Sequence, residues 1–76
     1  MRIERLVTMA NDIATYFTVE PDHALAVASV RDHLQRFWDP AMRRQIKAHL
    51  ADGGEGLNPL ALEAIRELEA PPADVR

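Results

Sequence analysis

The feature that most constrains the fold of this 76-residue chain is a pair of Asx-Pro steps, each followed by apolar residues at helical spacing. Asp39-Pro40 and Asn58-Pro59 fit a helix start, because the Asp or Asn side chain can accept hydrogen bonds from the free N–H groups of the first turn. Proline at the first helical position loses no hydrogen bond. The sequence "ADGGEG" at 51–56 separates the two segments, since glycine readily takes the left-handed conformation that ends a helix.

Two further helices are predicted before the first Asx-Pro step. Apolar residues recur at steps of three and four from Ile3 to Phe17, which is typical of one helical face. The chain then breaks at "TVEPD", and Pro21 suits the first turn of a second helix that runs to about Phe37. On that helix Asp32 and Arg36 form an expected i,i+4 ion pair, opposite an apolar face.

These signals predict an all-α fold, a small bundle of about four short helices with a flexible C-terminal tail. We expect residues 1–70 to form a single helical domain and 71–76, "PPADVR", to be a disordered tail. The second and third helices are expected to meet at a corner in which bulky side chains pack inward and an Asp-Pro step turns the chain. The residues of this predicted corner are Phe37, Trp38, Asp39, Pro40 and Met42.

Composition excludes several classes of protein. A chain of this length buries a small core, so its stability is marginal without a staple or a partner. The absence of cysteine excludes disulfides and thiolate-bound zinc or iron–sulfur clusters. No apolar run has membrane-spanning length. Glu4 and Asp12 interrupt the first segment, which is wrong for a secretory signal, so we expect a cytoplasmic protein without membrane contact.

No catalytic constellation is found in the sequence. His23, His33 and His49 are ten and sixteen residues apart, which does not place them on one helical turn as a metal site would require. His49 lies on the apolar face of its helix and is expected to be a satisfied structural histidine. Ser29, the only serine, lacks the turn that exposes a nucleophile. The glycines at 53–56 follow a predicted helix rather than a strand, so they do not form a phosphate loop. We therefore predict no catalytic, cofactor-binding or metal-binding residues.

Charge is distributed unevenly along the chain. The formal net charge is −3, yet residues 31–50 carry five basic side chains against two acidic ones, and residues 51–76 carry six acidic against two basic. Arg43 and Lys47 are one turn apart and Arg44 is adjacent, so a helix would direct them outward together as a basic row.

Three interpretations of this basic row remain open. It is a solvated face, or the phosphate-contacting row of a helix-turn-helix protein, or part of a protein-binding surface. The acidic net charge and the long "ADGGEGL" loop argue against nucleic acid. Arginine and aromatic residues are enriched at the centre of protein contacts, which favours the third interpretation. The candidate interface residues are Arg36, Arg43, Arg44 and Lys47, together with an apolar spot formed by Met9 and Tyr16.

Three motifs carry a resemblance to a known family. The segments "RLVTMANDIATYF", "HLQRFWDPAMRRQIKAHL" and "GGEGLNPLALEAI" occur in this order and span most of residues 3–66. They resemble the delta subunit of cytoplasmic, multi-subunit, NAD-dependent formate dehydrogenases. "FWDPAMR" at 37–43 is among the most specific pieces, and "TVEPDHALAVASV" is the divergent one.

The resemblance implies a non-catalytic accessory subunit. The holoenzyme of this family oxidises formate to carbon dioxide and reduces NAD, using a molybdenum or tungsten pterin, iron–sulfur clusters and FMN that belong to the larger subunits. The implied role of the delta subunit is to stabilise the complex or assist its assembly. A separate hypothesis is that it helps deliver the pterin cofactor during assembly. The implied partner is one of the larger subunits, with the catalytic alpha subunit favoured. A small helix-turn-helix nucleic-acid-binding regulator is the alternative.

Overall fold

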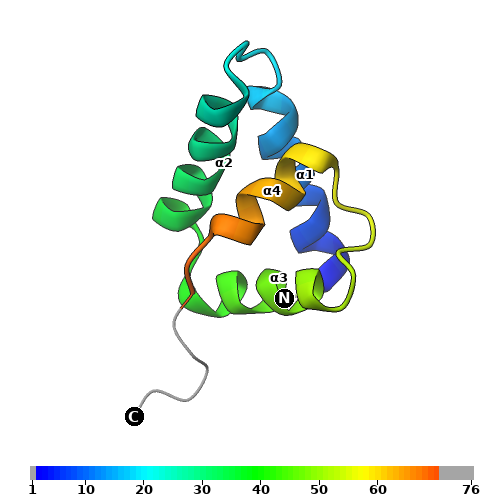
Figure 1. The fold of residues 1–76 in the computed structure, drawn as a ribbon. Helices are drawn as coiled ribbons and strands as arrows, with labels where there is room; N and C mark the ends of the chain where they lie inside the picture. Colours follow the sequence, from blue (N-terminus) through cyan, green and yellow to red (C-terminus); the bar gives the residue numbers. More distant parts are fainter. Residues whose placement is uncertain (1, 71–76) are drawn as a thin grey trace.

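The computed structural model describes residues 2–70, and within that range the chain forms four α-helices and no strand. They are α1 (Ile3–Phe17), α2 (His23–Phe37), α3 (Pro40–Ala51) and α4 (Pro59–Glu67). Helices α1 and α2 lie side by side and run in opposite directions, α3 crosses their lower ends, and α4 lies across both (Figure 1). The all-α prediction is confirmed, while the predicted tail at 71–76 lies outside the described residues.

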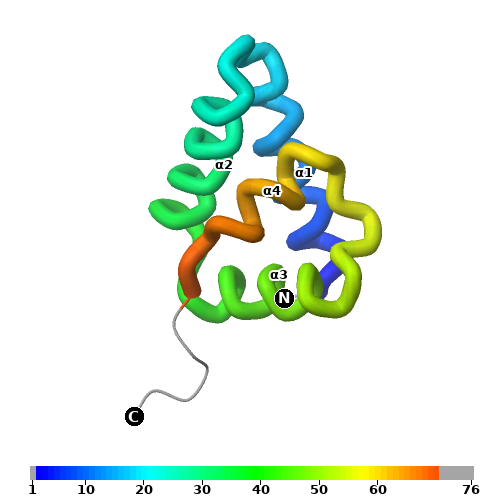
Figure 2. The backbone as a smooth tube through the Cα atoms, in the orientation of Figure 1, coloured from blue at the N-terminus to red at the C-terminus, as the bar shows by residue number. Residues whose placement is uncertain are grey.

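Two of the helix starts are formed by the predicted Asx-Pro steps. The Asp39 carboxylate accepts a hydrogen bond from the Met42 amide at 2.8 Å, and Pro40 opens α3. The Asn58 side-chain oxygen accepts from the Ala61 amide at 2.8 Å, and Pro59 opens α4. Each step satisfies one N–H group that the first helical turn cannot pair by itself. The path between these two helices is the long loop at the right of Figure 2.

The start of α2 differs from the prediction. The helix begins at His23, and the Asp22 carboxylate caps it by accepting from the Leu25 amide at 3.2 Å. Pro21 therefore lies before the helix and not in its first turn, so that prediction is wrong. The physical reason is that a free carboxylate next to Pro21 supplies a better N-cap than any residue before the proline.

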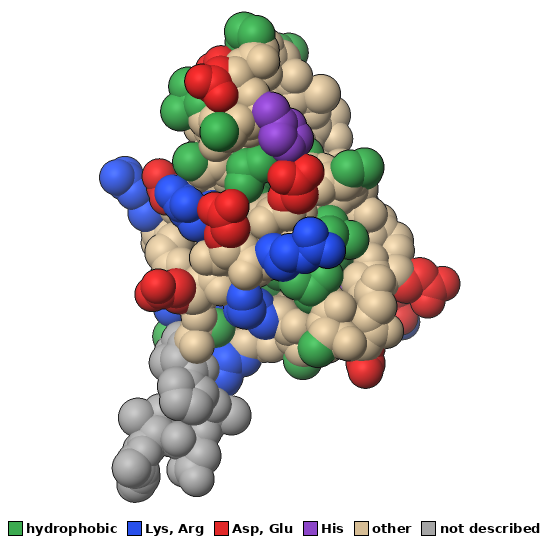
Figure 3. Space-filling view, in the orientation of Figure 1, with side chains coloured by type: hydrophobic (Ala, Val, Ile, Leu, Met, Phe, Trp, Pro, Cys, Tyr) green, Lys and Arg blue, Asp and Glu red, His purple; other side chains and the backbone are tan. Residues whose placement is uncertain are grey.

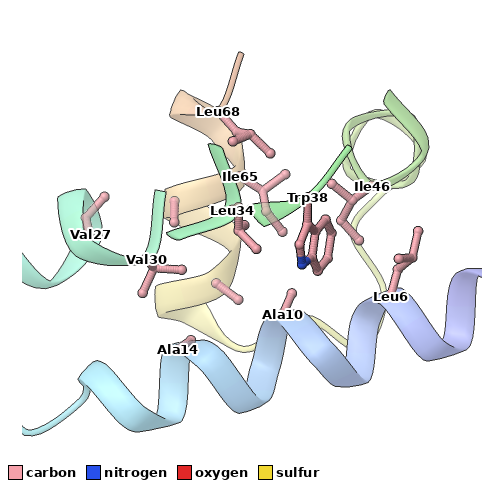
Figure 4. Close-up of a cluster of buried hydrophobic side chains, with 12 residues drawn as sticks. Leu6, Ala10, Ala14, Val27, Val30, Leu34, Trp38, Ile46, Ile65 and Leu68 are labelled. Atoms are coloured by element: carbon pink, nitrogen blue, oxygen red, sulfur yellow. The ribbon is translucent and has the colours of Figure 1, made fainter. Parts of the chain in front are cut away.

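The core combines small buried side chains with larger ones. Ala10 and Ala14 are fully buried on α1 together with Leu6, and their small side chains let the neighbouring helices approach closely. Figure 4 shows the Trp38 indole pointing from the end of α2 toward α1. The fully buried large side chains are Leu6, Val30, Leu34, Ile46, Ile65 and Leu68. One cluster therefore joins all four helices.

The corner between α2 and α3 differs from the prediction at Phe37. Trp38 is 4% exposed, whereas the Phe37 side chain is 70% exposed, so the prediction that Phe37 packs inward is wrong. Helix α2 ends at Phe37, and Trp38 continues in extended backbone with φ −90° and ψ 136°. This change of backbone directs Trp38 into the core and leaves Phe37 outside. Met42 packs partly buried against the core, and Asp39 and Pro40 are exposed at the turn.

Candidate partner-binding surface

The side chain of Arg43, a candidate interface residue, forms hydrogen bonds within the chain. Its Nη1 donates hydrogen bonds to the carbonyl oxygens of Trp38 at 2.7 Å and Gln35 at 3.2 Å. These carbonyls lie at the C-terminal end of α2, where a helix leaves acceptors unpaired and carries partial negative charge. Arg43 therefore caps α2 from the first turn of α3.

Lys47 caps the C-terminal end of α4. Its Nζ donates to the carbonyl oxygens of Ile65 at 2.9 Å and Arg66 at 3.2 Å, in the last turn of that helix. Both side chains are half-buried. The prediction that Arg43 and Lys47 project outward as one row is wrong, because each long side chain folds back onto the carbonyl end of a neighbouring helix.

The other two basic candidates have no such role. Arg36 is exposed on α2 and Arg44 is half-buried on α3. Within the described part of the chain, neither makes an ion pair or a side-chain hydrogen bond. The predicted basic row thus divides into two helix-capping cations and two arginines whose charge is available.

The acidic side chains of α4 tie it to α2. Glu63 lies 3.0 Å from the His23 Nε2, and Glu67 accepts from the Arg31 guanidinium at 2.9 Å. Asp32 pairs with Arg31 at 3.2 Å and not with Arg36, so the predicted i,i+4 pair is wrong. The hydrogen bonds that the Arg31 guanidinium donates to Asp32 raise the pKa of Arg31, and attraction to Asp32 and Glu67 adds to the effect against partial desolvation. Acidic and basic groups accordingly alternate over the face that carries α4 (Figure 3).

Along the side of the molecule where α1 meets α2, large apolar side chains are exposed to solvent. Tyr16 is 75% exposed and Phe37 is 70% exposed, although both are large apolar side chains. Tyr16 contacts Phe17 edge-on with ring centroids 5.1 Å apart, and the His33 and Phe37 rings are 4.7 Å apart. We call this surface the aromatic flank. Its residues are Met9, Ile13, Tyr16, Phe17, His33 and Phe37.

A shallow groove runs along the aromatic flank. It has a volume of about 460 Å³ and is lined by Asp12, Ile13, Tyr16, Phe17 and His33. Met9, predicted to form an apolar spot with Tyr16, is partly buried against the core, whereas Tyr16 is 75% exposed. Sequence reasoning placed Phe37 in the buried corner and did not assign His33 to this surface, although their four-residue spacing on α2 was an available signal.

The histidines do not converge on a metal site. His49 Nε2 lies 2.7 Å from the Glu55 carbonyl oxygen, which satisfies this half-buried ring as predicted. His23 faces Glu63, and His33 stacks on Phe37. Among residues 2–70, no three His, Cys, Asp or Glu side chains gather closely enough to hold a metal ion. No helix in the same range is long and apolar enough to cross a membrane.

The fold and this surface define a class: a small all-α protein that displays bulky apolar side chains where helices α1 and α2 meet. The particular family follows from a sequence comparison. The family model described as "NADH-dependant formate dehydrogenase delta subunit FdsD" matches residues 5–65, so the chain belongs to this family. No curated protein and no solved structure matches the chain.

Proposed function

We propose that this chain is a non-catalytic accessory subunit that stabilises NAD-dependent formate dehydrogenase or assists its assembly in the cytoplasm. The complex would oxidise formate to carbon dioxide and reduce NAD, with the chemistry carried by its larger subunits. The observation that supports this proposal is the family match, which extends over residues 5–65 of 76. The favoured partner is the catalytic alpha subunit.

The physical character of the chain is consistent with work in a complex. A domain of this size buries a small core, and its stability is correspondingly low. Tyr16 and Phe37 leave most of their surface in water. Burial of such a side chain against a partner would contribute about 1.5–3 kcal/mol, so association would stabilise both chain and complex.

We assign the cofactors of the complex to its larger subunits. The family resemblance implies a molybdenum or tungsten pterin, iron–sulfur clusters, FMN and NAD. This sequence supplies no cysteine for a cluster. Its contribution would be to bind and position larger subunits while these groups are inserted or retained.

The test is expression of the larger subunits with and without this chain. We expect the chain to raise the yield of intact complex and the rate of formate-dependent NAD reduction per cell mass. Molybdenum content per large subunit divides the two roles. A lower content without the chain indicates help with cofactor insertion, and an equal content with a lower yield indicates stabilisation. Equal yield, activity and metal content would reject the proposal, as would formate oxidation by the purified chain alone.

The nucleic-acid-binding alternative finds no specific support. It needs several outward basic side chains to neutralise phosphates, yet Arg43 and Lys47 donate to backbone carbonyls of α2 and α4. Duplex DNA binding that weakens steeply with added salt would be the observation in its favour.

A further inference from the structure

We infer that the turn between α1 and α2 inserts into an apolar pocket of a larger formate dehydrogenase subunit, and that Lys or Arg side chains border this pocket. We call residues 16–25 the hairpin tip. The inference rests on the proposed function and specifies which part of the chain contacts the partner and what chemistry the partner presents there.

The hairpin tip carries most of the exposed apolar bulk of the described chain. Among residues 2–70, four large apolar side chains are exposed, and three of them, Tyr16, Val19 and Leu25, belong to the tip at 75%, 87% and 50% exposure. The tip projects beyond α4 at the top of Figure 1. A projecting apolar group of this kind fits a concave site on a partner, where its side chains would leave water.

Hydrogen bonds within the turn hold its backbone in one shape. The Glu20 amide donates to the Phe17 carbonyl at 3.0 Å, and the Glu20 carboxylate accepts from the Asp22 amide at 3.1 Å. The Asp22 carboxylate in turn accepts from the Leu25 amide and caps α2. The apolar side chains of the tip are therefore presented by an ordered backbone, which reduces the entropy lost on binding.

The charge of the hairpin tip is negative. All nine Lys and Arg residues of the chain lie outside residues 6–30, whereas Asp12, Glu20 and Asp22 lie within this range. Glu20 and Asp22 belong to the turn itself, and Asp12 precedes Tyr16 by one helical turn. On the face shown in Figure 3, this end of the molecule displays apolar and acidic side chains but no Lys or Arg.

The cations nearest to the tip along the chain do not offset this charge. His23 lies 3.0 Å from Glu63, and Arg31 donates to Glu67 at 2.9 Å, so both are already paired with α4. Arg5 belongs to the other end of α1, about 18 Å from the end of that helix at 1.5 Å per residue. The negative charge of the tip is therefore left for a partner to answer.

The hollows on the two sides of the hairpin have the same character. One hollow, of about 380 Å³, lies between the tip and the start of α4, and its acidic lining residue is Glu20. The other is the groove of the aromatic flank, of about 460 Å³, and its acidic lining residue is Asp12. Neither hollow is lined by a Lys or Arg of residues 2–70. A partner surface with basic side chains around an apolar pocket therefore complements the tip in both charge and polarity.

A second copy of this chain fits the hairpin tip less well. A two-fold contact presents the same patch from both sides, so Glu20 and Asp22 would face their own copies and repel them. A head-to-tail contact, with the tip of one copy on the α2–α3 corner of the next, would build rings or filaments of this chain alone. A basic pocket on a different subunit avoids both outcomes.

The first experiment is co-purification of the tagged full-length chain with the co-expressed larger subunits. The test variant is Tyr16→Ser with Val19→Ser, which removes apolar bulk from the tip. The control is Phe37→Ser, because Phe37 is an aromatic residue of similar exposure at the opposite end of α2. Both variants should keep the helical circular dichroism of the wild-type chain, since the replaced side chains are mostly in water.

We expect the tip variant to lower the recovered complex about tenfold or more, as loss of central contact residues does, with Phe37→Ser within about twofold of wild type. Wild-type recovery by the tip variant, or an equal loss with Phe37→Ser, would overturn the inference but leave the proposed function intact. Failure of the wild-type chain itself to co-purify would reject the proposed function.

The second experiment tests the basic character of the pocket. Asp12→Asn with Glu20→Gln removes two negative charges and keeps a side-chain oxygen for the Asp22 amide. The matched control, Glu4→Gln with Glu55→Gln, removes two negative charges beside the start of α1. We expect the tip variant to lower recovery several-fold in low-salt buffer and to respond less to added salt than wild type, while the control follows wild type. Unchanged or improved recovery by the tip variant would overturn the choice of a basic partner surface.

The third experiment identifies the occupant directly. A photo-crosslinking phenylalanine analogue is placed at position 16 or 25 in the assembled complex, and at position 37 as the control. Positions 16 and 25 should form adducts with a peptide of a larger subunit that contains apolar residues next to Lys or Arg, and position 37 should not react with that peptide. An adduct between two copies of this chain, or with a peptide lacking basic residues, would overturn the choice of partner.

Discussion

Arg43 and Arg44 are neighbours with the same charge, and the structure gives them different surroundings. Arg43 donates to the Gln35 and Trp38 carbonyls, while Arg44 makes no side-chain hydrogen bond in the described range. The Nε–H group of Arg43 is buried without a partner, which offsets part of what the other two bonds contribute. The pair is therefore a matched test of helix capping by a cation.

We expect Arg43→Met to lower the free energy of unfolding by about 1–2 kcal/mol, because two carbonyls at the end of α2 lose their donor. Arg44→Met should change it by less than about 0.5 kcal/mol, as an ordinary surface substitution does. Urea denaturation followed by circular dichroism measures both. Equal effects of the two substitutions would contradict the capping role.

Phe37 and Trp38 form a second matched pair. Trp38→Ala should cost about 3–5 kcal/mol through lost burial and the cavity it leaves, which is a large part of a small domain's ~5–15 kcal/mol. Phe37→Ala should cost less than about 1 kcal/mol, because that ring already faces water. Thermal melts of the two variants give the comparison, and a Phe37→Ala variant that unfolds first would refute the assignment.

Helical phase alone could not distinguish these residues. It placed Phe37 inward together with Trp38, and the error arises because α2 ends at Phe37 and the extended Trp38 takes the core position. Phase also placed Arg43 and Lys47 outward. Helical phase gives the direction in which a side chain leaves the backbone, but not the position of the end of a long, flexible side chain. The carbonyls that Lys47 reaches are 18 and 19 residues away in sequence, so only the folded arrangement reveals them.

At the scale of the helices, three of the four have a capping side chain and one does not. Asp22, Asn58 and Asp39 cap α2, α4 and α3, whereas Arg2 at the start of α1 makes no side-chain cap hydrogen bond. This leaves the first turn of α1 with unsatisfied donors that a short acceptor could pair.

Arg2→Asp should raise the free energy of unfolding by about 0.5–1 kcal/mol, because aspartate supplies the missing acceptor and favourable charge at the helix N-terminus. The lost Arg2–Glu4 contact, at 3.6 Å and largely exposed, contributes little. Asp39→Ala is the opposite control and should cost about 0.5–2 kcal/mol. Chemical denaturation of both variants checks the prediction, which fails if Arg2→Asp is destabilising.

The helices were predictable because their signals are local. Asp39 and Asn58 accept from amides three residues away, so sequence spacing contains the whole interaction. The prediction from Pro21 was wrong because Asp22, one residue later, is the N-cap, so the helix begins after the proline. The predicted pairing of Asp32 with Arg36 was wrong because Arg31 lies next to Asp32 and pairs with it. Arg31 also pairs with Glu67 on α4, a contact that the pattern of a single helix does not contain.

At the scale of the whole molecule, Asn11 connects distant parts of the chain. Its Nδ2 donates to the Gly56 carbonyl at 2.8 Å, and its Oδ1 accepts from the Asn58 amide at 2.8 Å. One α1 side chain therefore fixes the loop that leads into α4, 45 and 47 residues away.

Asn11→Ala should lower the free energy of unfolding by about 1–3 kcal/mol, since it removes both bonds and leaves a half-buried amide without its acceptor. Hydrogen exchange should accelerate most at the start of α4. Thr15→Ala, an exposed site on the same helix, serves as the control and should leave exchange unchanged. Uniform acceleration across all helices would contradict the role of a local tether.

The aromatic flank shows what sequence could not supply at this scale. Tyr16 and Met9 were predicted as one apolar spot from α1 alone. Their neighbours His33 and Phe37 belong to α2, and the shared surface exists only because α1 and α2 pack antiparallel. The fold class followed from periodicity, whereas the surface depends on which helical faces meet.

Lys47 is the only lysine in the sequence, and its amine is the group that donates to the last turn of α4. Amine-selective dyes and cross-linkers should accordingly react with this side chain slowly. Once they do, acylation removes its positive charge and replaces hydrogens that now bond to the two carbonyls. Labels for imaging or mass spectrometry are better attached through a cysteine introduced at an exposed position, because a protein without native cysteine then carries a single reactive thiol.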